Sequence, residues 1–320
     1  MKFKLAIILY FGIATYVEAQ TTSTDSLRRD IRSYVARNFS EIRTFNFSWQ
    51  TSPSHQYYIR SNGNDLEKGE IHSQHTIRFN TTLPIVLTKH FSLYGIGQAD
   101  FYNYNTQQVE GERLFSQGES DNNQYYRLTL NGMYRTSLFS KPLILNGNLS
   151  VDGYNHGIQQ LLGTVAAISV LKRNQTTSIS AGLAFVWPFD KMPVMPVLTY
   201  WRQFSPSWSI DISMPRQFYL RYQWRGNNRL SAGCMMQSDQ YYFRSQDETR
   251  YFSETSLNAE LLYEYVAMRH FYFFVRGGLS SRLTGGIYKP NRKKVDSNAL
   301  DFHRQPQLFF SAGFSYNLYK

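Results

Sequence analysis

The C-terminal stretch Leu308–Lys320 (LFFSAGFSYNLYK) alternates apolar and polar side chains with a period of two. Successive side chains of a strand point to opposite faces, so this stretch predicts a strand with one apolar and one polar face. About ten such residues with aromatic ends suffice for a tilted strand that crosses a bilayer. The residues on the apolar face are Phe310, Ala312, Phe314, Tyr316 and Leu318.

The same alternation recurs along the chain and predicts fourteen strands in all. It is most regular in Gln124–Leu138. Leu161–Leu171 is apolar on both faces and fits a helix by periodicity alone, but its β-branched residues favour a strand. The other predicted strands are Arg43–Gln50, Glu70–Phe79, His90–Tyr104, Leu143–Tyr154, Thr176–Trp187, Val197–Gln203, Trp208–Met214, Gln217–Trp224, Leu230–Gln237, Ser256–Val266 and Phe271–Ser280.

Short and long connections alternate between these strands. Every second connection is a tight link, and the others include four long polar stretches, predicted as loops: Thr51–Lys68, Asn105–Asn123, Asp239–Thr255 and Thr284–Gln307. Short turns on one side and long loops on the other are typical of bacterial outer-membrane barrels, whereas a soluble β-sandwich has no such asymmetry. The bend at Pro215 is short for an outer loop, so twelve or sixteen strands remain alternatives.

A membrane barrel has to close, because an unpaired backbone group in hydrocarbon costs several kcal/mol. The first strand, Arg43–Gln50, is therefore expected to pair with Leu308–Leu318. The sequence thus predicts an all-β, antiparallel transmembrane barrel.

The N-terminus reads as an export signal, followed by a segment without strands. Residues 1–19 combine a basic start, the apolar run Leu5–Ile13 and a small-residue cleavage site at Val17–Ala19. Residues 20–40 carry Leu27, Ile31 and Val35 at helical spacing, which indicates a short amphipathic helix acting as a periplasmic latch or lumen plug, or else a frayed tail. The barrel is predicted over residues 41–320, and the expected location is the cell outer membrane.

Composition narrows the partners. Aromatic residues make up 16% of the chain, which fits the aromatic girdles of membrane barrels. The net charge is +11, and removing residues 1–19, with two lysines and one glutamate, leaves +10. A basic exported chain is expected to meet outer-membrane lipid, the phosphates of lipopolysaccharide or anionic solutes, and no nucleic acid.

Several stretches resemble small outer-membrane barrels of Bacteroidota. The residues that carry this resemblance are Met195–Tyr200, Ser207–Ile212, Phe218–Arg221, Leu261–Tyr265 and Phe271–Gly278. That group includes families described only as domains of unknown function. The resemblance covers roughly Leu143 to the end of the chain, implies an envelope address and a barrel fold, and brings no catalytic residues.

The C-terminal strand also resembles the signal that the barrel-assembly machinery reads. Its matching residues are Gly313, Phe314, Tyr316 and Leu318, at which assembly is expected to begin. The chain departs from the usual pattern by ending in Tyr319-Lys320 instead of a terminal Phe or Trp.

The charged residues on the polar strand faces are expected to line the lumen. A lumen of mixed sign either ties itself shut with ion pairs or lines a narrow polar channel. Arginines outnumber carboxylates, so the first functional hypothesis is a passive channel for small polar or anionic solutes. The lumen candidates are Arg78, Arg127, Arg135, Asp152, Asp211, Arg221, Glu260, Glu264 and Arg276.

Two alternatives stay open at this stage. The first is a closed structural or binding barrel that acts through its extracellular loops, and the second is a lipid-modifying barrel enzyme. No HExxH, GxSxG or P-loop pattern is present, and His72 and His75 would point to opposite faces of a strand. The sequence therefore predicts no catalytic residues, no metal site and no cofactor.

Overall fold

The computed structural model describes residues 43–111, 114–115, 123–139, 141–187, 194–245, 248–268, 270–292 and 300–318. The predicted signal at 1–19 and the helical segment at 20–40 lie outside the described residues. The strands are β1 (Phe45–Ser52), β2 (His55–Ser61), β3 (Asn64–Leu87), β4 (Phe91–Gly111), β5 (Asn123–Leu138), β6 (Lys141–Tyr154), β7 (Gly157–Arg173), β8 (Thr177–Trp187), β9 (Val194–Gln203), β10 (Trp208–Met214), β11 (Gln217–Trp224), β12 (Asn228–Ser245), β13 (Glu248–Ala267), β14 (Phe271–Tyr288), β15 (Leu300–Arg304) and β16 (Gln307–Tyr316).

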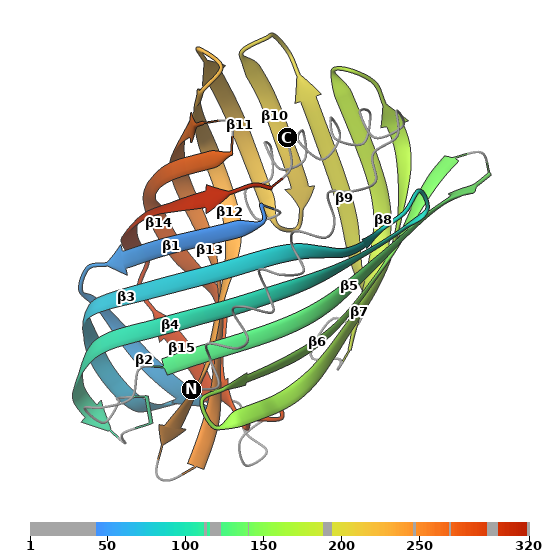
Figure 1. The fold of residues 1–320 in the computed structure, drawn as a ribbon. Helices are drawn as coiled ribbons and strands as arrows, with labels where there is room; N and C mark the ends of the chain where they lie inside the picture. Colours follow the sequence, from blue (N-terminus) through green and yellow to red (C-terminus); the bar gives the residue numbers. More distant parts are fainter. Residues whose placement is uncertain are drawn as a thin grey trace, which may run out of the picture.

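These strands close into one antiparallel barrel (Figure 1). The ring runs through β1, β3 to β14 and β16, and β16 returns to β1, so the predicted fourteen strands are confirmed. The predicted pairing of the first and last strands is also confirmed, with Phe45 opposite Tyr316 and Phe47 opposite Phe314. The first residue of β1 and the last residue of β16 lie on the side of the barrel that carries the short turns. We call this side the short-turn end.

The closing pair of strands continues past two proline interruptions. β1 and β2 both run antiparallel to β3, and they are separated at Pro53-Ser54. β15 and β16 are likewise separated at Gln305-Pro306, and both pair with β14. Proline lacks the N–H that a sheet ladder needs, so each strand breaks there and resumes as β2 or β15.

Apolar side chains face outward and polar side chains face inward in the wall. On β13, Leu261 is 59% exposed, whereas Asn258 is fully buried inside. On β16, Phe310 points outward and Ser311 inward. This distribution of apolar and polar side chains is the reverse of that in a soluble protein, and it is the one expected where hydrocarbon surrounds the barrel wall.

The far end of the barrel has a second closure. The first residue of β11 pairs with Met235 of β12, and β12 continues past that point without β11 as a neighbour. This part of β12 bends across the barrel, and its Tyr242 pairs with Gln124 of β5. At that level β2 to β5 and β12 to β15 form a ring of eight strands, called here the cap. An eight-stranded ring has an interior that side chains can fill. Figure 1 shows β12 and β13 running past β10 and β11 to the end where β2 and β15 lie.

An aromatic core fills the cap. Phe252 stacks on Tyr241 at 4.7 Å between ring centroids and lies 5.4 Å from Phe115 and 5.0 Å from Phe302. Glu67 fixes Phe115 in place, because its buried carboxylate accepts hydrogen bonds from the backbone N–H groups of Leu114 and Phe115, at 2.6 and 2.8 Å. The other buried members on the cap side are Tyr57, Ile59, Ile71, Tyr102, Phe243 and Ile287. The same buried cluster continues on the opposite face of β12 and β13 with Tyr125, Tyr242 and Tyr251.

The cap corrects the prediction of four long polar loops. Thr51–Lys68 contains β2, a tight turn at Asn62-Gly63 and the start of β3. The other three stretches hold the ends of β4, β12, β13 and β14 and the whole of β15. β3 is 24 residues long, well beyond the roughly nine to eleven that cross a bilayer, and the excess builds the cap. The expected loop at Pro215 is a tight turn between two separate strands.

The closing strand has no room for a side chain at Gly313. A Cβ there would lie 2.2 Å from the backbone oxygen of Phe47 and 2.5 Å from the ring of Phe274. We expect Gly313→Ala to lower the free energy of unfolding by about 1–3 kcal/mol, since the β1–β16 seam has to move apart. Gly147→Ala is the matched control, because a Cβ there meets nothing within 4 Å. Urea unfolding in lipid vesicles measures both, and equal losses would contradict the crowding at Gly313.

Candidate functional site

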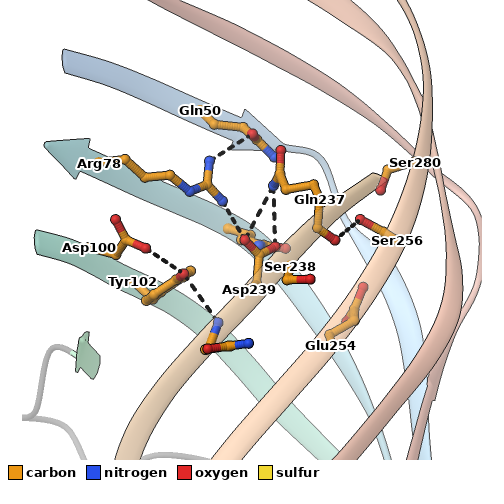
Figure 2. A network of polar contacts seen from close by, with 12 residues as sticks. Gln50, Arg78, Asp100, Tyr102, Gln237, Ser238, Asp239, Glu254, Ser256 and Ser280 are labelled. Carbon is orange, nitrogen blue, oxygen red and sulfur yellow. Dashed lines mark hydrogen bonds and ion pairs between the residues drawn. The ribbon is translucent and has the colours of Figure 1, made fainter. Parts of the chain in front are cut away.

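A polar network crosses the lumen and joins β3 to β12 (Figure 2). Arg78 of β3 forms an ion pair with Asp239 of β12 at 2.5 Å, although these strands are not neighbours in the sheet. Gln50 accepts a further hydrogen bond from Arg78 at 3.1 Å, and Gln237 donates one to Asp239 at 3.2 Å. The base of the cap is therefore closed by charge pairing.

The two faces of β12 do different work at this level. Asp239 and Tyr241 point into the cap, toward Arg78 and the aromatic core. Gln240 and Tyr242 point the other way, toward β5 and β6. β12 is thus a partition between the filled cap and the inner faces of β5 to β11.

A second polar cluster lies near the short-turn end of the lumen. Glu264 accepts hydrogen bonds from Arg43 at 2.6 Å and from Nε of Arg229 at 2.7 Å. Arg43 also donates to Ser315 at 2.8 Å and stacks on the ring of Tyr272 at 3.8 Å. Arg43 precedes β1, so its side chain ties the start of the barrel wall to the lumen at this level.

A third cluster gathers around Asp152 on β6. Its carboxylate accepts hydrogen bonds from Tyr125 at 3.0 Å and Tyr242 at 2.9 Å. Arg292, in the connection after β14, forms an ion pair with it at 2.5 Å and lies over the ring of Tyr251. Asp152 therefore ties the partition strand to the wall.

The inner surface is packed on one side and partly open on the other. On the strands that build the seam and the cap, Ser231, Asn258 and Ser311 are fully buried. On β7 to β10 six inner side chains are small, carry a hydroxyl group and keep partial exposure. They share this inward face with the buried residues Ala166, Ala184 and Asp211, and with Trp201, which lies opposite Ser178 and Asp211. We call this surface the small-residue face; its members are Thr164, Ser178, Ser180, Thr199, Ser209 and Ser213.

Six of the nine predicted lumen residues are buried against partners. Asp211 pairs with Arg221 at 2.6 Å, and Glu260 accepts a hydrogen bond from Tyr219 at 2.5 Å. The other three are Arg78, Asp152 and Glu264, whose partners are given above.

Three predicted lumen residues are only partly buried: Arg127, Arg135 and Arg276. Arg276 lies 4.0 Å from Glu260. Arg127 donates to the side-chain oxygen of Gln240 at 3.1 Å, and Arg135 donates to Ser92 at 3.3 Å. Neither Arg127 nor Arg135 forms an ion pair with a carboxylate of the described residues.

Several lumen charges were not predicted. Asp239 lies in a stretch expected to be a loop, and Arg304, which pairs with Glu254 at 2.6 Å, lies in another. Arg43 is the first residue of the predicted strand Arg43–Gln50, but it was not among the predicted lumen residues. Two other lumen charges could have been predicted from the alternation of the strands. Asp100 lies on the same face as Gln98 and Tyr102, and Arg229 lies on the same face as Ser231.

The closed sheet, the apolar exterior and the charged interior define the class of protein: an outer-membrane β-barrel. Among the described residues, no helix has the length and apolar character that a membrane crossing needs. Residues 144–317 match the model of the family Domain of unknown function (DUF6268), and the chain belongs to this family.

Solved structures of other barrels are similar at low identity. The COG4313 outer membrane channel from Pseudomonas putida F1 shares 11% identity over 84% of this chain and 95% of that chain, with a TM-score of 0.32. A Pseudomonas aeruginosa FadL homologue shares 10% over 85% and 90%, with a TM-score of 0.35. The Escherichia coli outer membrane protease OmpT shares 9% over 85% and 96%, with a TM-score of 0.28. These values carry no argument about function. No curated protein matches the chain.

Proposed function

We propose that the protein is a passive channel for small polar solutes, with anions preferred, and that it is not an enzyme. The observation that carries the proposal is the small-residue face. Its hydroxyl-bearing side chains keep partial exposure, while the cap and seam sides of the lumen are filled. A solute path needs polar groups that can replace water and enough width to let the solute pass.

The location and partners follow from this proposal. With the short-turn end in the periplasm and the cap outside, the apolar wall lies in outer-membrane lipid and the cap meets lipopolysaccharide. Export by cleavage of residues 1–19, and insertion by the barrel-assembly machinery through Gly313, Phe314, Tyr316 and Leu318, belong to the same proposal.

Planar-bilayer recording of the purified protein tests the channel. We expect stable unitary conductance and, in a salt gradient, a reversal potential that indicates anion preference. Ser180→Trp should lower the unitary conductance about twofold or more, because the indole would occupy space beside the small-residue face. Leu183→Trp on the same strand is the control, since Leu183 is 58% exposed on the outer face. Absence of conductance in all salts and at all voltages tested would contradict the proposal that the protein is a channel.

The cap favours a second candidate, a closed barrel that serves as a structural or binding protein. Its aromatic core and the lumen-spanning pair of Arg78 and Asp239 close the direct route along the barrel axis. This candidate expects no unitary conductance and a protein that remains folded and inserted. Hydrolysis of phospholipid by the purified protein would instead support the alternative that the barrel is a lipid-modifying enzyme.

A further inference from the structure

We propose that the inner faces of β5 and β6 form a binding track for a hydroxyl-rich organic anion, such as the carboxylate of a sugar acid. This inference rests on the proposed channel and narrows its solute class. The track consists of two arginines without a carboxylate partner among the described residues, and of a row of amide and hydroxyl groups between them: Arg127, Thr129, Asn131, Arg135, Asn146, Asn148 and Ser150.

The two arginines supply the charge recognition. Arg127 is held by Gln240 and lies over the Tyr125 ring at 5.2 Å, and its buried Nε has no hydrogen-bond partner among the described residues. Its neighbour across the strand, Asp152, is already bound by Arg292 and two tyrosines. Among the described residues, the guanidinium of Arg135 donates to Ser92 and to the sulfur of Met133, at 3.3 and 3.6 Å. A guanidinium in this condition is suited to a carboxylate or phosphate, which it binds with two parallel hydrogen bonds.

The row between them supplies hydroxyl recognition. Asn131 donates hydrogen bonds to Asn148 and, at 3.3 Å, to Asn146, while Thr129 and Ser150 share one at 2.8 Å. Each amide carries two donors and an acceptor, so these side chains can exchange bonds among themselves for bonds to sugar hydroxyls. All three asparagines keep partial exposure, unlike Asn258 across the lumen, which is fully buried.

The spacing sets how the track would be used. Arg127 lies near the cap and Arg135 near the short-turn end of the same strand, eight residues apart. At about 3.4 Å per residue this is roughly 27 Å, longer than one monosaccharide. The anion is therefore bound at one arginine at a time, with the amide row offering hydroxyl contacts on the way between the two.

Calorimetric titration of the detergent-purified full chain with galacturonate, and with neutral galactose, tests the track. Galacturonate should bind about tenfold more tightly than galactose, because a charge-assisted bond is stronger than a neutral one. Arg127→Gln together with Arg135→Gln should weaken galacturonate about tenfold, whereas either change alone leaves one arginine and should lower the number of binding sites. Arg127→Lys should keep part of the affinity. Asn131→Leu should weaken both sugars. Arg173→Gln is the control, an exposed arginine at the end of β7 that should change neither.

The outcomes separate the track from the channel. Equal affinities for galacturonate and galactose, or galacturonate binding that both glutamine variants leave unchanged, would overturn the track, even in a protein that conducts. Arginine-dependent binding in a protein without conductance would support the track and reject the channel. Heat-modifiable migration of every variant on a denaturing gel shows that the barrel has folded before its affinity is compared.

Discussion

Phe252→Ala is expected to destabilise the cap by about 3–5 kcal/mol, the cost of removing a large aromatic side chain from a packed core. Phe252 is 2% exposed, and its ring contacts Tyr241, Phe115 and Phe302. These rings come from β12, β15 and the connection after β4, so the loss loosens the cap from several directions. The wall beneath it keeps its own strand pairing and should remain folded.

Two probes distinguish the cap from the wall. All five tryptophans lie in β1 and β8 to β11, outside the cap, so their fluorescence follows the wall. Trypsin cleavage at Arg244 and Arg250, beside the β12–β13 connection, follows the cap. Phe252→Ala should speed this cleavage without shifting the tryptophan transition. Phe273→Ala, on the outer face and 50% exposed, is the control that should leave cleavage unchanged. A cleavage rate that Phe252→Ala does not alter would show that the core does not hold the cap together.

The sequence predicted the wall because one rule holds along all of it. In β5, β13 and β16, apolar side chains face lipid and polar side chains face the lumen, so each strand can be recognised in the sequence by its alternation with a period of two. The pairing of the first strand with the last, β1 with β16, followed from the need to close the ring.

The cap was not predicted because its strands carry apolar side chains on the inner face and polar side chains on the outer face, the reverse of the wall. In β2, Tyr57 and Ile59 point into a dry core, whereas Gln56 and Arg60 face water. Such a stretch is polar on its outer face, which made it read as a loop. Its pairing also depends on the Tyr242–Gln124 contact between β12 and β5, which no local pattern encodes.

Part of the charged lumen residues was predicted, but the partners of these residues were not. Alternation placed Arg221 and Glu264 on inward faces, but it could not say which strands would approach each other across the barrel. Arg78 finds Asp239 only because β12 bends inward above the short strand β11. The distinction between paired arginines and the two of the binding track is therefore a property of the tertiary structure.

Glu264→Gln is expected to cost about 3–5 kcal/mol of unfolding free energy, because it leaves two buried guanidinium groups without their carboxylate. Glu264 is 1% exposed and binds Arg43 and Arg229 together. The control Glu110→Gln removes a carboxylate whose side chain is 70% exposed and pairs with Lys68 at 3.2 Å. That change should cost at most about 1 kcal/mol, as is usual for surface ion pairs.

Urea unfolding in lipid vesicles, followed by tryptophan fluorescence, measures both losses, and a double-mutant cycle assigns the first. Arg43→Met alone leaves Glu264 paired with Arg229 and should cost less than Glu264→Gln. Combined, the two changes should cost less than their sum, since each removes a member of the same contact. Strict additivity, or a loss for Glu264→Gln no larger than that for Glu110→Gln, would mean that Arg43 is not held by Glu264. Its place in the lumen would then depend on the ring of Tyr272 and on Ser315 instead.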